Sequence, residues 1–136
     1  GKLSPPIEGL PPLRAEGQGG LLDVCLHPDY TKNGWIYFAY SALSPEAGKT
    51  RSNTAIMRAK LEDNKLVNQQ VIFQGEPFTD RSHHYGCKLA FDGKGHLFFG
   101  IGDRGQHFEF PRTLAMPTEK STASTTMAQF RKTIRL

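Results

Sequence analysis

The chain has 136 residues, of which 38% are hydrophobic and 22% are charged, and its formal net charge is +4. This size accommodates one modest core, and the composition excludes a chain that is disordered throughout. No stretch approaches the roughly 20 apolar residues of a membrane helix, so no membrane span is expected. The sequence begins GKLSPPIEGL, without a signal peptide or an initiator Met, and we expect the natural N-terminus to lie upstream.

The positive charge is confined to residues 112–136. This stretch carries five Lys or Arg residues and one Glu, which leaves 12 basic and 12 acidic residues in the rest of the chain. The body of the chain therefore has no basic excess that favours nucleic acid. No nucleic-acid partner is expected, although a basic binding tail is an alternative interpretation of residues 112–136.

The first half of the chain predicts a loop followed by a hairpin. Residues 1–20 are rich in Pro and Gly and predict an irregular segment, because Pro cannot donate to a sheet. Residues 21–27 form an apolar strand, residues 28–34 (PDYTKNG) a turn, and residues 35–41 (WIYFAYS) an aromatic-rich strand. Residues 42–53 are predicted to form a polar loop.

Two more hairpins follow. Residues 54–61 and 66–74, separated by Asp63 and Asn64, predict the second hairpin, although 54–61 also suits a short helix. After a loop at 75–83, residues 88–91 and 96–101 predict the third hairpin, around a turn at 92–95.

The third hairpin repeats the layout of the first after about 60 residues, a pattern typical of propeller blades. We therefore predict an all-β fold in which residues 1–111 form about two blades of a β-propeller, with a β-sandwich as the alternative. A closed propeller needs at least about four blades, more than this chain can supply.

Few residues suggest chemistry. Residues 100–105 satisfy GxGxxG, but the following HFEFP is a poor helix start, which argues against dinucleotide binding. His83 and His84 with Asp103 suit a general base and the carboxylate that orients it, or simply a surface His and a turn Asp.

The remaining candidates give weaker signals. The five His residues show no metal-ligand spacing, so no metal site is predicted. Cys25 and Cys87 lie in apolar strand patterns and are expected to be small buried hydrophobes; a disulfide would need close Cα atoms.

Two stretches, GQGGLLDVCLHPDYTKNGWIYFAYS and HYGCKLAFDGKGHLFFGIGDRGQ, resemble the soluble quinoprotein sugar dehydrogenases (the glucose/sorbosone dehydrogenase family) from about Gly17 to Gln106. The resemblance implies a six-bladed propeller that uses pyrroloquinoline quinone (PQQ) and calcium. Such a protein oxidises aldose sugars at the anomeric carbon, delivers electrons to an artificial or physiological acceptor, and works in the periplasm or outside the cell.

The same resemblance implies roles for individual residues. His84 would take the proton from the anomeric hydroxyl, Asp103 would orient His84, and Gln18 would hydrogen-bond the sugar. The chain departs from the family at Lys88, where Arg is usual, and at Cys87, where a small residue is usual. Because Lys cannot reproduce a bidentate Arg contact, the site geometry is expected to change there.

Residues 112–136 depart from the family pattern. Back-translation from Pro111, shifted by one nucleotide, permits a sequence that resembles the family's continuation. We therefore hypothesise a single-nucleotide frameshift near Pro111 and a non-homologous, disordered tail.

On this interpretation the chain is an N-terminal piece of a sugar dehydrogenase that lacks most cofactor-binding residues and is inactive alone. A non-enzymatic propeller-like binding module is the main alternative, and an adapter that uses the Pro-rich loop is a third.

Overall fold

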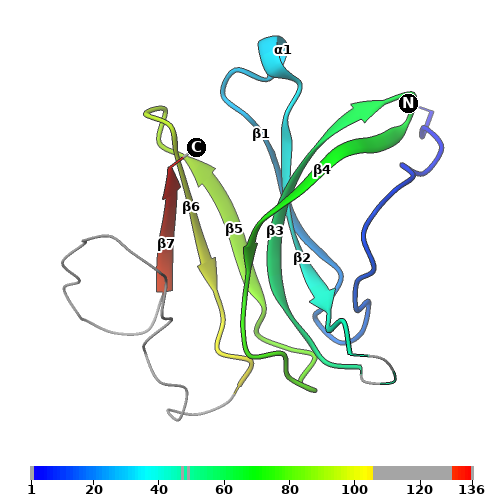
Figure 1. Ribbon diagram of the computed structural model, residues 1–136, viewed down its shortest axis with the longest axis vertical. Helices are drawn as coiled ribbons and strands as arrows, with labels where there is room; N and C mark the ends of the chain where they lie inside the picture. Colours follow the sequence, from blue (N-terminus) through cyan, green and yellow to red (C-terminus); the bar gives the residue numbers. More distant parts are fainter. Residues whose placement is uncertain (1, 47, 49, 106–129, 136) are drawn as a thin grey trace.

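A computed structural model describes residues 2–46, 48, 50–105 and 130–135. These residues form two antiparallel sheets (Figure 1). In spatial order, the first sheet contains β1 (Leu21–Leu26), β2 (Ile36–Leu43), β3 (Ser52–Glu62) and β4 (Lys65–Gln74). The second contains β5 (Gly86–Phe91), β6 (His96–Ile101) and β7 (Phe130–Arg135). The predicted all-β fold is confirmed, and the two sheets are two propeller blades.

All three predicted hairpins are present, and the first two share one sheet. Strands β2 and β3 pair without interruption from Ile36↔Ala59 to Leu43↔Ser52. The 54–61 segment is therefore part of a strand and not a helix, because its backbone is paired with β2 on one side and β4 on the other. Strands β2 and β3 also extend farther into the predicted 42–53 loop than the sequence pattern indicated.

The turn between β1 and β2 contains a short helix, α1 (Tyr30–Asn33), that the sequence did not predict. The His27 ring fixes this turn, because its Nδ1 accepts from the Asp29 backbone N–H at 3.0 Å and lies 2.8 Å from Asn33 Nδ2. Gly34, in the left-handed region at φ 68°, ends the helix. A four-residue helix is too short to leave a periodic signal.

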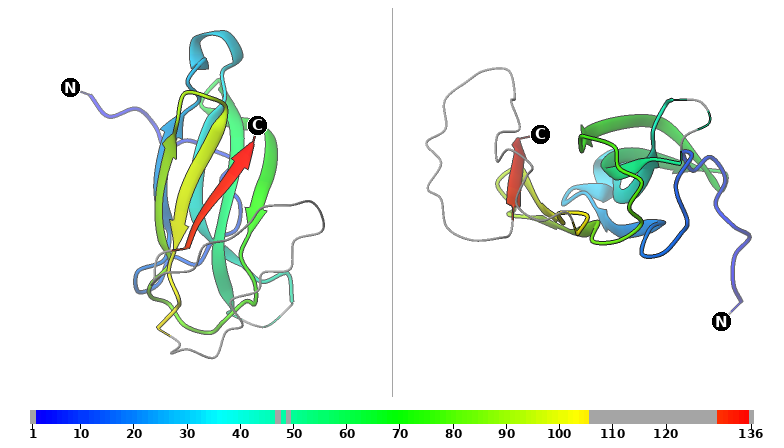
Figure 2. Two further views of the ribbon diagram at one scale, coloured as in Figure 1. Left: turned by 90° about the vertical axis from the view of Figure 1, so that its left-hand side faces the viewer. Right: turned by 90° about the horizontal axis from the view of Figure 1, so that it is seen from below.

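Strand β2 is buried on both faces of the first sheet, because its side chains alternate between two separate apolar clusters. Tyr37 and Ala39 join a cluster between the two sheets that includes Leu89 and Phe99. Phe38, Tyr40 and Ala42 lie on the other face, in a cluster against which Leu13 of the N-terminal segment packs. The second sheet and the N-terminal segment thus cover opposite faces of the first sheet (Figure 2).

The N-terminal segment is irregular, as predicted, but it is attached to the first sheet. Glu8 exchanges backbone hydrogen bonds with Asn64 and Leu66, and the Arg14 N–H donates to the Ser41 carbonyl, all at 2.9 Å. This attachment brings residues 14–20 to the end of the sheets opposite α1 (Figure 1).

Cys25 and Cys87 are free thiols that are half-buried against the cluster between the sheets. The structure thus places them at the interface between blades, less completely buried than predicted. Desolvation is the largest cause that raises the pKa of each thiol to about 11.

Strand β7 lies within the stretch for which the sequence predicts disorder. Its backbone pairs with β6 from His96↔Arg135 to Ile101↔Phe130. The physical reason is that β6 would otherwise present an unpaired edge, which a later segment can satisfy. Residues 112–129 of the predicted tail lie outside the described residues. No helix among the described residues is long and apolar enough to cross a membrane.

Candidate active site

Three loops meet at the end of the sheets opposite α1 (Figure 1). Residues 14–20 lead into β1, residues 79–85 lead into β5, and residues 102–105 follow β6. In an antiparallel hairpin, the first strand begins at the end of the sheet where the second strand finishes. Strands β5 and β6 therefore bring the last two loops together. The predicted residues Gln18, His84 and Asp103 lie one in each loop.

His84 and Asp103 form a hydrogen-bonded pair, with 3.0 Å between His84 Nδ1 and Asp103 Oδ1. The backbone N–H of Gly105, and then the His84 ring, lower the pKa of Asp103 below its usual 3.8. Asp103 is therefore ionised at neutral pH and can only accept. The proton of a neutral His84 ring accordingly lies on Nδ1, which leaves Nε2 free to take a proton.

The pair is open to solvent, since the side chains of His84 and Asp103 are 55% and 63% exposed. The ring is therefore accessible to a molecule from solution. The ion-pair contribution to stability is small at such exposure, so the geometry is the chief consequence of the contact.

The backbone of His84 is held in an unusual conformation. Its φ is 53°, in the left-handed region that non-Gly residues adopt at a cost of about 1–2 kcal/mol. Gly102 lies directly against it, so that a Cβ there would collide with the His84 carbonyl oxygen. Close approach, rather than a positive φ, is what requires glycine at this position. The backbone strain at His84 persists only because the surrounding structure holds this conformation in place.

Gln18 is held against the same loop. Its backbone N–H donates to the Ser82 carbonyl at 2.8 Å, and its Oε1 accepts from the His84 backbone N–H at 2.9 Å. The acceptor role identifies the side-chain oxygen, so Nε2 is the atom left to donate elsewhere. Gly17 allows Gln18 to approach Ser82 closely, because a Cβ at position 17 would collide with Ser82.

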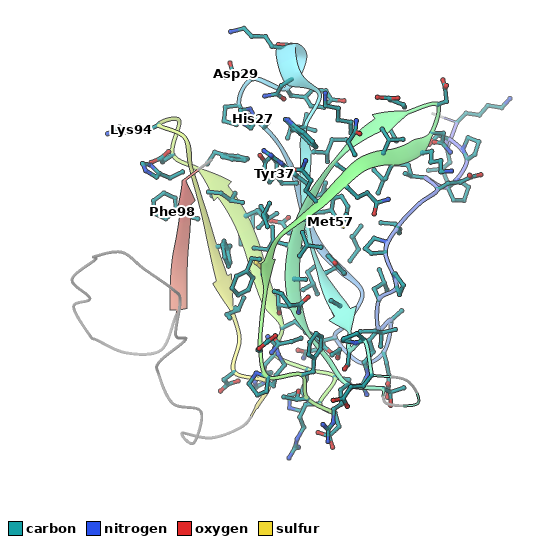
Figure 3. All side chains as sticks on the ribbon, in the orientation of Figure 1. His27, Asp29, Tyr37, Met57, Lys94 and Phe98 are labelled. Atoms are coloured by element: carbon teal, nitrogen blue, oxygen red, sulfur yellow. The ribbon has the colours of Figure 1, made fainter. Side chains whose placement is uncertain are left out.

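His83 does not join the hydrogen-bonded pair. Its ring packs edge-on to His84, with 4.9 Å between ring centroids, and lies against Gly105. A second His–Asp pair, His96 with Asp92, lies at the β5–β6 turn with 2.7 Å between Nδ1 and Oδ2. This turn, marked by Lys94 in Figure 3, is at the end of the sheets that carries α1.

Arg104 is buried beneath the pair, with only 2% of its surface exposed. Its Nη2 donates to Thr54 Oγ1 at 2.9 Å and to the carbonyls of Tyr85 and Gly102 at 3.3 and 3.1 Å. Its guanidinium carbon lies 4.4 Å from the centroid of the Tyr85 ring. Arg104 and Thr54 therefore link the first sheet to the loops that carry His84 and Asp103.

Lys88 does not contact the His–Asp pair. Its Nζ lies 3.2 Å from Asp23 Oδ1, while Asp23 Oδ2 accepts from the Leu89 backbone N–H at 2.7 Å. Lys88, which stands where the family usually has Arg, therefore joins β5 to β1. The 3.0 Å contact between His84 and Asp103 is formed without it. The ion pair between Lys88 and Asp23 contributes little to stability, because the Lys88 side chain is largely exposed.

The described part of the chain contains no cluster of three His, Cys, Asp or Glu side chains that could hold a metal ion. Calcium takes roughly six to eight oxygen ligands. The described residues therefore do not fit a calcium site, and none of their contacts identifies a residue that holds a quinone.

The fold and the site define a β-propeller class with a His–Asp pair at one end of its blades. The sequence model for glucose/sorbosone dehydrogenases matches residues 1–135. The chain belongs to this family, as the resemblance predicted.

Two curated relatives match part of the chain. An aldose sugar dehydrogenase of Escherichia coli (strain K12) is 37% identical over 106 residues, which cover 76% of this chain and 28% of the relative. An uncharacterised protein of Synechocystis sp. is 38% identical over 93 residues, covering 68% of this chain and 22% of that protein. The chain thus spans less than a third of the curated relatives that it matches.

Solved structures agree in fold. A glucose dehydrogenase matches with a TM-score of 0.69 and 40% identity, over 76% of this chain and 32% of its own. The apo-form of the soluble aldose sugar dehydrogenase from Escherichia coli matches with a TM-score of 0.68 and 36% identity, over 76% and 29%.

The sequence predicted Gln18, His84 and Asp103, and the structure brings all three together. The sequence analysis did not identify Arg104, Thr54 or Gly102 as residues of the site. The signal available for Arg104 was its place between glycines directly after an apolar strand, where a charged side chain is more readily interpreted as part of a solvated turn.

Proposed function

We propose that this chain supplies the general base of a quinoprotein that oxidises aldose sugars at the anomeric carbon, with PQQ as hydride acceptor and calcium as its metal. The observation that supports the proposal is the 3.0 Å contact between His84 Nδ1 and the ionised Asp103. The family to which the chain belongs, and the aldose and glucose dehydrogenases that it matches, support the substrate class.

The residues of the chain account for the proton side of this reaction. His84 Nε2 accepts the proton of the anomeric hydroxyl while the hydrogen on the anomeric carbon leaves with two electrons, so that an aldose becomes a lactone. Asp103 holds the ring with Nε2 toward the substrate and stabilises the imidazolium that forms. Gln18 Nε2 donates to a sugar oxygen.

Because the described residues hold no calcium cluster, we place the cofactor contacts in other parts of the full protein. The chain alone is then expected to have negligible activity. Dye reduction with an aldose, PQQ and calcium should not exceed that of His84→Ala; a calcium-dependent excess would show that the chain is active by itself.

A chimera tests the function directly. In the Escherichia coli aldose sugar dehydrogenase, the segment that aligns with residues 17–105 is replaced by that of this chain. We expect PQQ- and calcium-dependent aldose oxidation that falls about 10²- to 10⁴-fold on His84→Ala. A chimera that binds PQQ saturably but oxidises no aldose would contradict the proposal and favour a binding module.

By the same resemblance, we propose that the full protein delivers its electrons to an artificial or physiological acceptor and works in the periplasm or outside the cell. Fractionation of cells that express the tagged full-length protein tests the location. Recovery in the cytoplasm would contradict it.

A further inference from the structure

Arg104 is a buried cation without a carboxylate hydrogen-bonded to it in the described part of the chain. Nη2 makes three hydrogen bonds, but Nε and Nη1 have no partner among the described residues. Burying a charge with unsatisfied N–H groups is costly unless the charge is paired. Stability alone therefore gives a poor account of an arginine here.

The acceptors of Nη2 indicate what the residue does. Tyr85 directly follows His84, and Gly102 directly precedes Asp103. One nitrogen thus binds the carbonyl groups of both backbone segments that carry the pair.

Thr54 fixes this nitrogen to the first sheet. Its Oγ1 accepts from Arg104 Nη2 and donates to the Tyr85 carbonyl at 2.8 Å. Thr54 lies in β3 and is fully buried, so it provides a rigid anchor outside the second sheet.

We propose that Arg104 is a positioning residue for sugar oxidation: by holding the Tyr85 and Gly102 carbonyls together, it sets the contact between His84 and Asp103. This inference rests on the proposed role of His84 as the base. Desolvation lowers the pKa of Arg104, but only to about 10, so the guanidinium remains charged at neutral pH.

The test is the tautomer of His84 in the whole chain, read by long-range ¹H–¹⁵N NMR of the neutral imidazole. The unaltered chain is expected to show one tautomer, with the proton on Nδ1. In Arg104→Met this pattern should be lost and the two ring nitrogens should become averaged, while a cooperative urea transition shows that the variant still folds.

Arg58→Met is the matched control. Arg58 also lies 4.4 Å from an aromatic ring, that of Trp35, and also makes side-chain hydrogen bonds, but on residues of the first sheet that do not contact the pair. It should retain the single tautomer. Loss of the pattern in both variants would show general loosening and overturn the proposal, as would its retention in Arg104→Met.

If Arg104→Met does not fold, Thr54→Val provides the test of whether Arg104 positions the His84–Asp103 pair. Valine matches the shape of threonine but removes the oxygen that binds both Arg104 and Tyr85. Loss of the single tautomer in a folded Thr54→Val supports the proposal, and its retention overturns it. The readout needs no sugar, PQQ or calcium, so an inactive chimera would count against the proposed function and leave this test unaffected.

Discussion

The Gln18 side chain accepts a hydrogen bond from the backbone N–H of His84 at 2.9 Å, across 66 residues of sequence. Gln18 therefore has two tasks in the proposed site. Its oxygen holds the backbone of the base, and its nitrogen is available for the sugar.

Two substitutions of Gln18 should separate these tasks in the chimera. Gln18→Glu keeps an acceptor for the His84 N–H but loses the donor, so KM for the aldose should rise with kcat little changed. Gln18→Leu loses both, and kcat should fall as well. Steady-state kinetics distinguish the two outcomes, and equal kcat values in both variants would show that the contact to His84 has no catalytic consequence.

Asp103→Asn should lower kcat of the chimera about 10²- to 10⁴-fold, because an amide no longer fixes the Nδ1–H tautomer or stabilises the imidazolium. Asp92→Asn is the matched control, since it alters the other His–Asp pair, at 2.7 Å. We expect that control to stay within about twofold of the parent, as surface substitutions usually do. Equal losses in the two variants would contradict the assignment.

Gly102→Ala should disrupt the site and lower the free energy of unfolding by about 1–3 kcal/mol, as overpacking does. The added methyl meets the His84 carbonyl, a backbone atom that cannot move aside. Gly93→Ala serves for comparison, because open space surrounds that position although its φ is +72°. Urea unfolding and chimera activity should both separate the two variants; full activity of Gly102→Ala would exclude the close approach.

Asp92 should make stability dependent on pH in the acid range. Desolvation raises the pKa of Asp92, but hydrogen bonds from Lys94 and His96 outweigh it and lower the pKa from 3.8 to about 2. Because the folded-state pKa is the lower one, the stabilisation is present above pH 3.8 and disappears as the pH falls toward 2.

The difference in unfolding free energy between the unaltered chain and Asp92→Asn should shrink across that window. Urea titrations at several pH values measure it. A difference that is constant with pH would show that the His96 and backbone contacts do not favour the ionised carboxylate.

The strands were predictable because they are apolar or aromatic-rich runs of strand length and their turns are rich in Gly, Asn and Asp. Residues 36–43 and 96–101 are runs of this kind. Helix α1 was not predictable, since the PDYTKNG segment has turn chemistry throughout and its helix is fixed by the His27 ring. Strand β7 was missed because composition is a poor guide where a neighbouring edge offers backbone partners.

The site was predictable only in part. The residue types of His84 and Asp103 suit a base and its partner, but their selection from the five histidines depended on resemblance to a family. Nothing in the local sequence of Gln18 indicates contact with His84. Arg104 was missed because its burial depends on Thr54 of β3, which approaches Tyr85 and Gly102 only when the two sheets pack together.

The separations between these residues also determine the order in which the site is assembled during folding. His84 and Asp103 lie 19 residues apart on one hairpin, whereas Gln18 is 66 residues from His84. Closing the longer loop carries the larger entropy cost and requires the two blades to dock. In refolding, the β5–β6 hairpin that carries His84 and Asp103 should therefore form early, and the contacts of this hairpin with Gln18 and Thr54 should appear only in a slower kinetic phase.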